Sequence, residues 1–429
     1  MPASIRIGQD EFDTEILDPT RRDSPRTGTG SAATVVDPHR PSVRSRDTAP
    51  PVGAHRGLDE CVRVAAVWAD EVDREGRFPA ESVAALRSAG LFGAAVPTDL
   101  GGAGLSLTRL AAITRALGRS CGSSAMIFAM HQTQVLSVVR HGRSASMRAL
   151  LAAIAEHQLL LTSATTEIDV RGGVRSSGCA VEHRGDRVRL AKTAPVISYG
   201  GYADVVLVTA RRTPAGAPND QVLLACPRSE MRLTPVGTWH TIGFRGTRSP
   251  GFRLAVDTGS GALLDDPYAE ISAQTMLPAS HVLWSAACLG IADAALLRAR
   301  QSVQTARRRS AGPAPLGSIR LAELVIAHQQ LVDTVFGAAA RFESLAKNPA
   351  AMSTVGVLLE FSAVKASAST LLIDLVGRAL TICGLTGSLP GHEPAMSRHL
   401  RDAYGTAVMI SNDRILNHDS QLALMRLGH

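Results

Sequence analysis

The sequence predicts an α+β fold: an N-terminal helical domain, a small middle β-domain and a C-terminal four-helix bundle. Two changes in hydrophobic period indicate this order. Apolar residues recur at helical spacing from Leu58, at alternating positions from about residue 160, and at helical spacing again after Ile271. The predicted domains are therefore residues 57–159, 160–268 and 269–429.

Residues 1–56 precede these domains and differ from them in composition. They are rich in Pro, Ser, Thr, Arg and Asp and show no periodicity, so we expect a disordered extension. The first residues, MPASIRIGQDEFD, carry acids where a secretory signal has an apolar segment. We therefore expect a cytoplasmic protein. No uninterrupted apolar run reaches the ~18–20 residues of a membrane helix, so no membrane partner is expected.

Composition argues against several kinds of site. The formal charge is +7, but only 4% of residues are aromatic, so surfaces that stack on nucleic-acid bases are not expected. A basic pocket for a phosphorylated cofactor or an anionic carrier fits this charge better. The six cysteines are scattered without CxxC spacing, which predicts buried thiols and no disulfide or metal site.

The first helical domain contains a glycine-rich run, GLFGAAVPTDLGGAG at Gly90–Gly104, shortly after RFP at Arg77–Pro79. Pro79 is placed to open one helix and Gly90 to end it. Further helices are predicted over Leu107–Leu117 and Ser124–Val139.

The middle domain alternates apolar and polar residues. CAVEHRGDRVRLAKTA predicts a hairpin with Gly185 and Asp186 near its turn. ADVVLVTARR and QVLLACP predict buried strands, and MRLTPVG and FRLAVDT continue the sheet. The last domain predicts an up-and-down bundle of four helices: Ser280–Ala306, Leu316–Lys347, Thr354–Cys383 and Pro394–Leu424.

Five landmarks in this order resemble the acyl-CoA dehydrogenase superfamily over nearly the whole chain from Leu58. They are RFP with the glycine-rich run, Lys192–Arg211, Thr238–Leu254, ICGLTG at Ile382–Gly387 and RHLRDA at Arg398–Ala403. The resemblance implies FAD held between the β-domain and the C-terminal bundle. It also implies contacts from a neighbouring subunit to that cofactor, in a homodimer or homotetramer.

The resemblance assigns cofactor contacts to five residues, although their motifs depart from the family pattern. TTEIDVRGG, at residues 165–173, matches the family's loop only at its start. The stacking Trp of the flavin strand is replaced in Val196–Ser198. The assigned residues are Thr166, Ile197, Ser198, Arg307 and Gly384.

The reaction implied is removal of the Cα and Cβ hydrogens of an acyl thioester, on CoA or an acyl carrier protein. A carboxylate takes the α-proton and must lie within reach of it. The two usual glutamate positions are occupied by Ile410 and Ser280. Asp413 or Glu167 is the substitute base in this interpretation, although Asp413 also suits a helix cap.

The same departures resemble the flavin-dependent monooxygenases and oxidases of the superfamily, in which Ser and His side chains often serve near the flavin. Ser280, His281 and His131 are the candidates for that role, together with Ser198. Three interpretations remain open: an FAD-dependent acyl-thioester dehydrogenase, a monooxygenase or oxidase on the same fold, and a scaffold without catalysis. An electron-acceptor protein or O2 is the expected oxidant.

Overall fold

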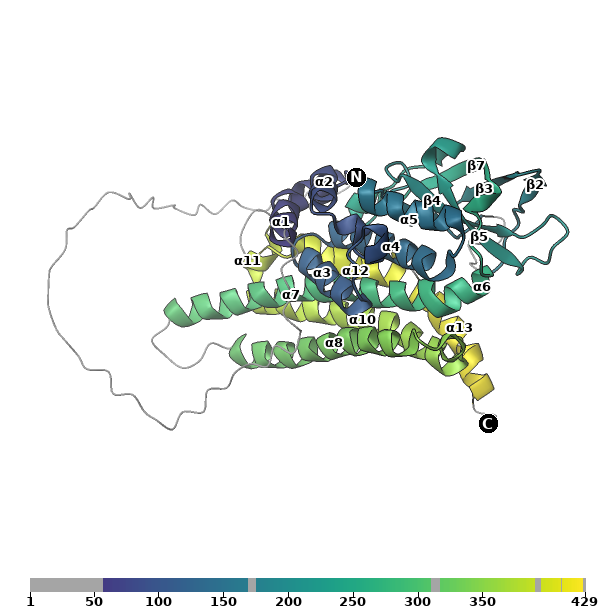
Figure 1. Cartoon of the computed structure of the whole chain (residues 1–429). Coiled ribbons are helices and arrows are strands. Elements are labelled where there is room, and N and C mark those ends of the chain that lie inside the picture. Colours follow the sequence, from purple (N-terminus) through teal and green to yellow (C-terminus); the bar gives the residue numbers. More distant parts are fainter. Residues whose placement is uncertain (1–56, 169–174, 310–316, 390–394, 410, 427–429) are drawn as a thin grey trace, which may run out of the picture. The chain divides into compact units, whose positions relative to one another are not determined.

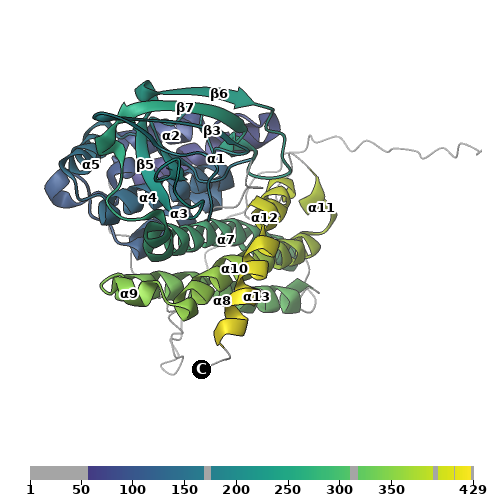
Figure 2. The same ribbon diagram turned by 90° about the vertical axis from the view of Figure 1, so that its right-hand side faces the viewer.

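The computed structural model describes residues 57–168, 175–309, 317–389, 395–409 and 411–426 (Figures 1 and 2). The predicted extension, residues 1–56, lies outside this part of the chain. A helical domain, a small sheet domain and a second helical domain follow one another, which confirms the predicted fold class.

The first domain is helical throughout. Its helices are α1 (Leu58–Glu75), α2 (Ala80–Ser88), α3 (Leu107–Ser120), α4 (Gly122–His141) and α5 (Ala145–His157). As predicted, α2 begins after Pro79 and ends just before Gly90. Helix α5 was not predicted, although the Ser144 hydroxyl caps it by accepting a hydrogen bond from the Met147 amide (3.3 Å).

The glycine-rich run forms two short 3-10 turns, η1 (Leu91–Gly93) and η2 (Thr98–Leu100). Gly90 and Gly101 adopt φ angles of 71° and 84°, a region that side chains disfavour. A Cβ atom on Gly102 would lie 2.1 Å from the Val96 carbonyl oxygen. The backbone of this run therefore requires glycine.

The middle domain contains two sheets around a second hydrophobic core. Strand β4 (Val205–Arg211) pairs with β1 (Leu161–Ala164) in parallel and with β5 (Gln221–Pro227) antiparallel. The other sheet is antiparallel, in the order β2-β3-β7-β6. It consists of β2 (Glu182–Arg184), β3 (Arg187–Ala194), β7 (Gly251–Gly259) and β6 (Met231–Val236). The predicted hairpin is confirmed as β2 and β3, which turn at Gly185 and Asp186.

The last domain begins with α6 (Tyr268–Ile271) and a π-helical turn (Ser272–Met276). Its long helices are α7 (Leu277–Arg309), α8 (Gly317–Leu345) and α10 (Val355–Cys383). They run side by side in both views (Figures 1 and 2). Short helices α9 (Pro349–Met352) and α11 (Leu385–Ser388) flank α10.

The fourth predicted bundle helix, Pro394–Leu424, is wrong as a single element. The structure has two helices there, α12 (Ser397–Met409) and α13 (Asn412–Arg426). Ser411, Asn412 and Asp413 follow α12, and all three residue types favour a helix start over a helix interior. The chain therefore begins a new helix at this point.

Two stretches among the described residues are long and apolar enough to cross a membrane by length and composition, Tyr268–Arg309 and Val355–Cys383. The structure buries 78% and 44% of their apolar windows. Buried core helices pass the same test, so this finding is weak evidence for a membrane span.

Asp402 of α12 connects three parts of the fold. Its Oδ1 atom accepts a hydrogen bond from the Phe244 amide of the middle domain (2.7 Å). A Cβ atom on Gly122, the first residue of α4, would lie 2.6 Å from Oδ2. The carboxylate therefore lies against the positive end of α4. Burial nevertheless raises the pKa of Asp402 to about 6.

Candidate functional site

The segment Val196–Ser198 follows β3, and two of its three side chains are accessible. Val196 is 43% exposed and Ser198 is half-buried, whereas Ile197 is fully buried in the core of the middle domain. The Ile197 amide donates to the Pro250 carbonyl (3.0 Å), and the Ser198 carbonyl accepts from the Thr162 hydroxyl (2.7 Å). Within the described residues the Ser198 hydroxyl makes no hydrogen bond. Ile197 thus anchors the segment, while Val196 and Ser198 are available.

A second accessible segment, Thr166–Ile168, lies beside the end of β3. The Ile168 amide donates to the Thr193 carbonyl (3.1 Å), and the Ile168 side chain is 50% exposed. Thr166 is half-buried. Two exposed apolar side chains, Ile168 and Val196, therefore accompany two hydroxyl groups. An apolar surface with a few polar groups fits a planar heteroaromatic ring such as a flavin.

Glu167 lies between Thr166 and Ile168 and points away from solvent. Its carboxylate accepts hydrogen bonds from the Ser177 hydroxyl (2.8 Å), the Gly178 amide (3.0 Å) and the Cys179 amide (2.9 Å). Both oxygens are engaged, and the residue is 2% exposed. This geometry gives Glu167 the role of an anchor between two loops, which opposes its use as the base.

His131 of α4 is buried with both ring nitrogens occupied by main-chain groups. Its Nε2 lies 2.8 Å from the Phe92 carbonyl, and its Nδ1 accepts from the Leu161 amide (3.0 Å). The imidazole is therefore neutral with the proton on Nε2. Burial lowers the pKa of His131 to about 4. Neither nitrogen is open to a substrate, so this residue joins α4 to β1 and the glycine-rich run.

Ser280 and His281 lie near the start of α7 and are both buried. The Ser280 hydroxyl donates to the Leu277 carbonyl of its own helix (2.8 Å). His281 Nδ1 lies 3.0 Å from the Phe361 carbonyl of α10, which fixes the proton on Nδ1. Nε2 is then an acceptor, and it has no partner within the described residues. Burial lowers the pKa of His281 to about 4.

Lys365 is a buried cation that the sequence did not single out. It is 3% exposed on α10, and its ammonium donates to Asn412 Oδ1 (2.7 Å) at the start of α13. Asn412 in turn donates from Nδ2 to the Ser369 hydroxyl (3.0 Å). Burial lowers the pKa of Lys365 to about 8. A single lysine within the small and apolar run FSAVKASAST was the available sequence signal.

The carboxylates of α13 differ in their surroundings. Asp413 is exposed in the first helical turn, where it suits the helix dipole, and Ile410 lies outside the described residues. Asp419, two turns further on, is half-buried, and its Oδ1 has no hydrogen-bond partner among the described residues. Burial raises the pKa of Asp419, while Ser362 and Arg175 oppose that rise. Asp419 is therefore a second ionisable group that sequence reasoning missed.

Gly384 and Arg307, two further predicted cofactor residues, lie at helix ends. Gly384 ends α10 with φ 66° and ψ −152°, a conformation restricted to glycine, and its amide donates to the Leu380 carbonyl (2.9 Å). Arg307 is exposed in the last turn of α7. Among the described residues, neither forms a hydrogen bond or ion pair with Val196–Ser198 or with His281.

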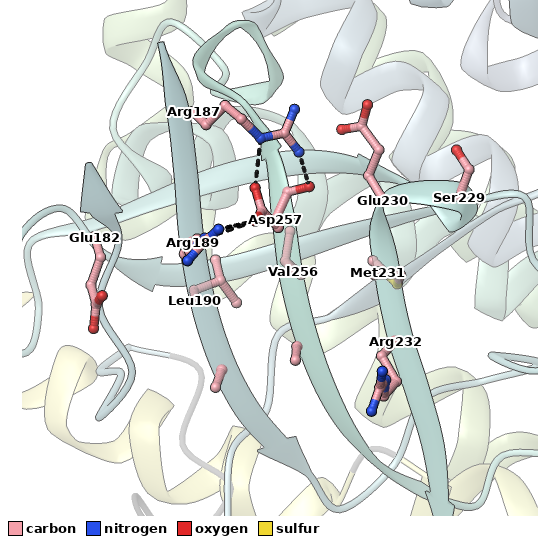
Figure 3. Close-up of a pocket in the computed structure, with 12 residues that line it drawn as sticks. Glu182, Arg187, Arg189, Leu190, Ser229, Glu230, Met231, Arg232, Val256 and Asp257 are labelled. Carbon is pink, nitrogen blue, oxygen red and sulfur yellow. Dashed lines mark hydrogen bonds and ion pairs between the residues drawn. The ribbon is translucent and has the colours of Figure 1, made fainter. Parts of the chain in front are cut away.

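A shallow groove crosses the outer face of the β2-β3-β7-β6 sheet (Figure 3). The paired residues Ala191 and Ala255 form its floor. Arg187 and Arg189 both bind Asp257, at 2.6 and 2.7 Å. None of the predicted site residues lines this groove, and its arginines are engaged within the sheet.

Comparison with known proteins adds an independent finding. The family model for the acyl-CoA dehydrogenase N-terminal domain matches residues 59–158, and the model for the C-terminal domain matches residues 271–410. Cyclohex-1-ene-1-carbonyl-CoA dehydrogenase of Syntrophus aciditrophicus is 24% identical over 56% of this chain and 59% of that protein. Amino sugar nitrososynthase DnmZ of Streptomyces peucetius is 30% identical over 56% and 60%. The chain thus spans less than two thirds of the length of these relatives.

Solved structures share the fold. Dibenzothiophene monooxygenase of Paenibacillus sp. A11-2 has a TM-score of 0.72 at 19% identity, covering 87% of this chain and 98% of that chain. Butyryl-CoA dehydrogenase of Megasphaera elsdenii has a TM-score of 0.70 at 18% identity, covering 86% and 98%. Because the two family models together match more than half of its residues, the chain belongs to the acyl-CoA dehydrogenase family.

Proposed function

We propose that this protein is a flavin-dependent oxidoreductase that uses FAD to oxidise the CH–CH group of an acyl thioester. The observation that carries the proposal is the pair of accessible segments at the end of β3, which offer the exposed side chains of Ile168 and Val196 with the hydroxyl groups of Thr166 and Ser198, a combination that suits a flavin ring. When bound, FAD would supply the acceptor for the hydride from the β-carbon. Several relatives are named as dehydrogenases or reductases of acyl-CoA compounds, which supports this reaction class.

In this proposal His281 takes the α-proton. It follows Ser280, where the family resemblance expects a glutamate. Its Nε2 is an acceptor without a partner among the described residues, and its lowered pKa of about 4 is close to the ~4.3 of an ordinary glutamate. The Cα–H bond would break as an N–H bond forms, and its electron pair would become the new double bond as the β-hydride leaves.

The remaining site and partner assignments belong to the same proposal. Arg307 and Gly384 would contact the FAD of a neighbouring subunit in a homodimer or homotetramer. The thioester would be carried on CoA or an acyl carrier protein, and electrons would pass to an acceptor protein or O2. We infer that these steps take place in the cytoplasm.

A second candidate function is a flavin-dependent monooxygenase. The favouring observation is the absence of a carboxylate at Ser280, with the neutral His281 beside it. The similarity to amino sugar nitrososynthase DnmZ and to the fold of dibenzothiophene monooxygenase supports the same reading. Such an enzyme would take reduced flavin and O2 instead of oxidising an acyl thioester.

The two candidates differ in a direct spectroscopic test. We expect the purified protein to bind oxidised FAD and an acyl thioester to bleach its absorption under anaerobic conditions. Absence of bleaching, together with oxygen consumption in the presence of reduced flavin, would establish the monooxygenase instead. Failure to bind flavin in either redox state would leave only the interpretation of a scaffold without catalysis.

The base is assigned by four matched variants. We expect His281→Gln to abolish bleaching while FAD binding persists. Three carboxylate variants should still bleach. Asp413 is exposed, and the Glu167 carboxylate is occupied by hydrogen bonds, so we expect no effect in Asp413→Asn or Glu167→Gln. Because the proposal gives the proton transfer to His281, Asp419→Asn should bleach as well. Loss of bleaching in one of these three variants alone would move the assignment to that carboxylate.

A further inference from the structure

Lys365 and His281 meet at the same carbonyl group. His281 Nδ1 donates to the Phe361 carbonyl, and in an α-helix that carbonyl also accepts the amide of the residue four positions later, which is Lys365. The imidazole of α7 therefore lies against the turn of α10 that carries the ammonium group. Neighbouring contacts hold this pairing, since the Ser285 hydroxyl reaches both the His281 carbonyl (2.6 Å) and the Val364 carbonyl (3.5 Å).

The position of the ammonium is fixed from the other side by α13. Asn412 Oδ1 accepts from Lys365 Nζ (2.7 Å) and from the Ser369 hydroxyl (3.3 Å), one turn further along α10. The His281 ring also lies near the Trp284 ring, with centroids 5.8 Å apart. Neither the Lys365 ammonium nor the His281 imidazole can therefore move away from this position without breaking a hydrogen bond.

Lys365 is the charged group that acts on His281 among the described residues. The other titratable groups of this helix junction are Cys288 on α7, Asp402 on α12 and Asp419 on α13. Cys288 is buried and its thiol stays protonated, because burial raises its pKa to about 12. Asp402 is largely ionised at neutral pH, and Arg175 acts on Asp419. The charged group that acts on the His281 ring is nevertheless the Lys365 ammonium.

We propose that Lys365 is a positioning residue for His281, which it keeps neutral so that Nε2 presents a lone pair where the family has a carboxylate. Desolvation of the buried ring is the largest cause that disfavours its protonation, and the positive charge of the Lys365 ammonium disfavours it further. The pair thereby gives an imidazole the proton affinity of a carboxylate. This inference rests on the proposed role of His281 in the flavin-dependent reaction.

The test is a histidine titration by NMR on the full chain without added flavin. The NMR signal of His281 is identified as the histidine signal that is missing from the spectrum of His281→Gln. We expect its titration midpoint to stay near pH 4 in the wild type and in Lys365→Arg, which keeps the charge. In Lys365→Met the midpoint should rise by up to about one pH unit, because the ring stays buried and only the effect of the charge is removed. An unchanged midpoint in Lys365→Met would overturn the proposal.

Lys365→Gln provides a second neutral variant in case Lys365→Met does not fold, because its amide can still donate to Asn412. Flavin binding by the wild-type protein is the second measurement, and it separates this inference from the proposed function. If the wild type binds no flavin, the proposed function is wrong, whereas the titration still reports on the effect of Lys365. An active wild type with an unshifted midpoint in both neutral variants defeats the inference alone.

Discussion

His131 and His281 show how one residue type serves two purposes. Both are buried, and burial lowers the pKa of each to about 4. Main-chain groups occupy both nitrogens of His131, whereas in the part of the chain that the structure describes only one nitrogen of His281 is occupied. The number of main-chain partners, rather than burial or pKa, therefore separates the structural histidine from the candidate base.

Replacing His131 by leucine should destabilise the protein by about 2–5 kcal/mol, because it leaves a buried carbonyl and a buried amide without partners. The measurement is urea-induced unfolding. His157→Leu is the matched control, since that side chain is 60% exposed and its loss should change the free energy of unfolding by less than about 0.5 kcal/mol. Equal effects in the two variants would contradict this role.

The same variant has a predictable pH dependence. His131 is neutral in the folded protein and has a lowered pKa, so its stabilisation is complete above the unfolded value of about 6.5 and declines as the pH falls toward 4. The stability difference between the wild type and His131→Leu should therefore be largest above pH 6.5 and shrink in acid. A difference that grows on acidification would contradict the assigned protonation state.

At the scale of elements, the glycine-rich run raises the question of why glycine is needed there: because a side chain would collide with neighbouring atoms, or because the backbone must be flexible. Gly102→Ala should cost about 1–3 kcal/mol or more, because the new methyl group would collide with the Val96 carbonyl. Gly201→Ala is the control, since a Cβ there meets no atom within 4 Å. Thermal unfolding of both variants measures the difference. Similar melting temperatures would favour flexibility as the reason for glycine.

Much of the element pattern could be predicted from periodicity and helix signals, but the site could be predicted only in part. Pro79 and Gly90 marked the ends of α2 correctly. The break between α12 and α13 was missed because the helical period continues across it. Lys365 was missed because periodicity shows which residues share a helix face but not which faces are covered by helices distant in the sequence. The partner carbonyls of His131 and His281 come from remote segments, so no local pattern could tell the two apart.

At the scale of the whole molecule, Asp402 joins α12, the middle domain and the start of α4. Asp402→Ala should destabilise the protein by about 1–3 kcal/mol, since the buried Phe244 amide loses its acceptor. Asp402→Asn keeps an acceptor and is the matched variant. Because burial raises the pKa of Asp402 to about 6, the wild type should lose stability relative to Asp402→Asn as the pH rises from about 4 through 6. Chemical denaturation at several pH values checks both expectations.

The contact made by Asp402 also has a consequence for how related sequences can diverge. The carboxylate binds the main chain of residue 244, so the bond itself does not depend on which side chain that residue carries. Position 122 is constrained instead, because a Cβ there would lie 2.6 Å from the carboxylate. Across homologues we therefore expect positions 122 and 402 to change together, whereas changes at the buried position 244 should follow the surrounding core and not residue 402. Hydrogen bonds to main-chain groups would let this fold keep its domain contacts while many of its side chains change.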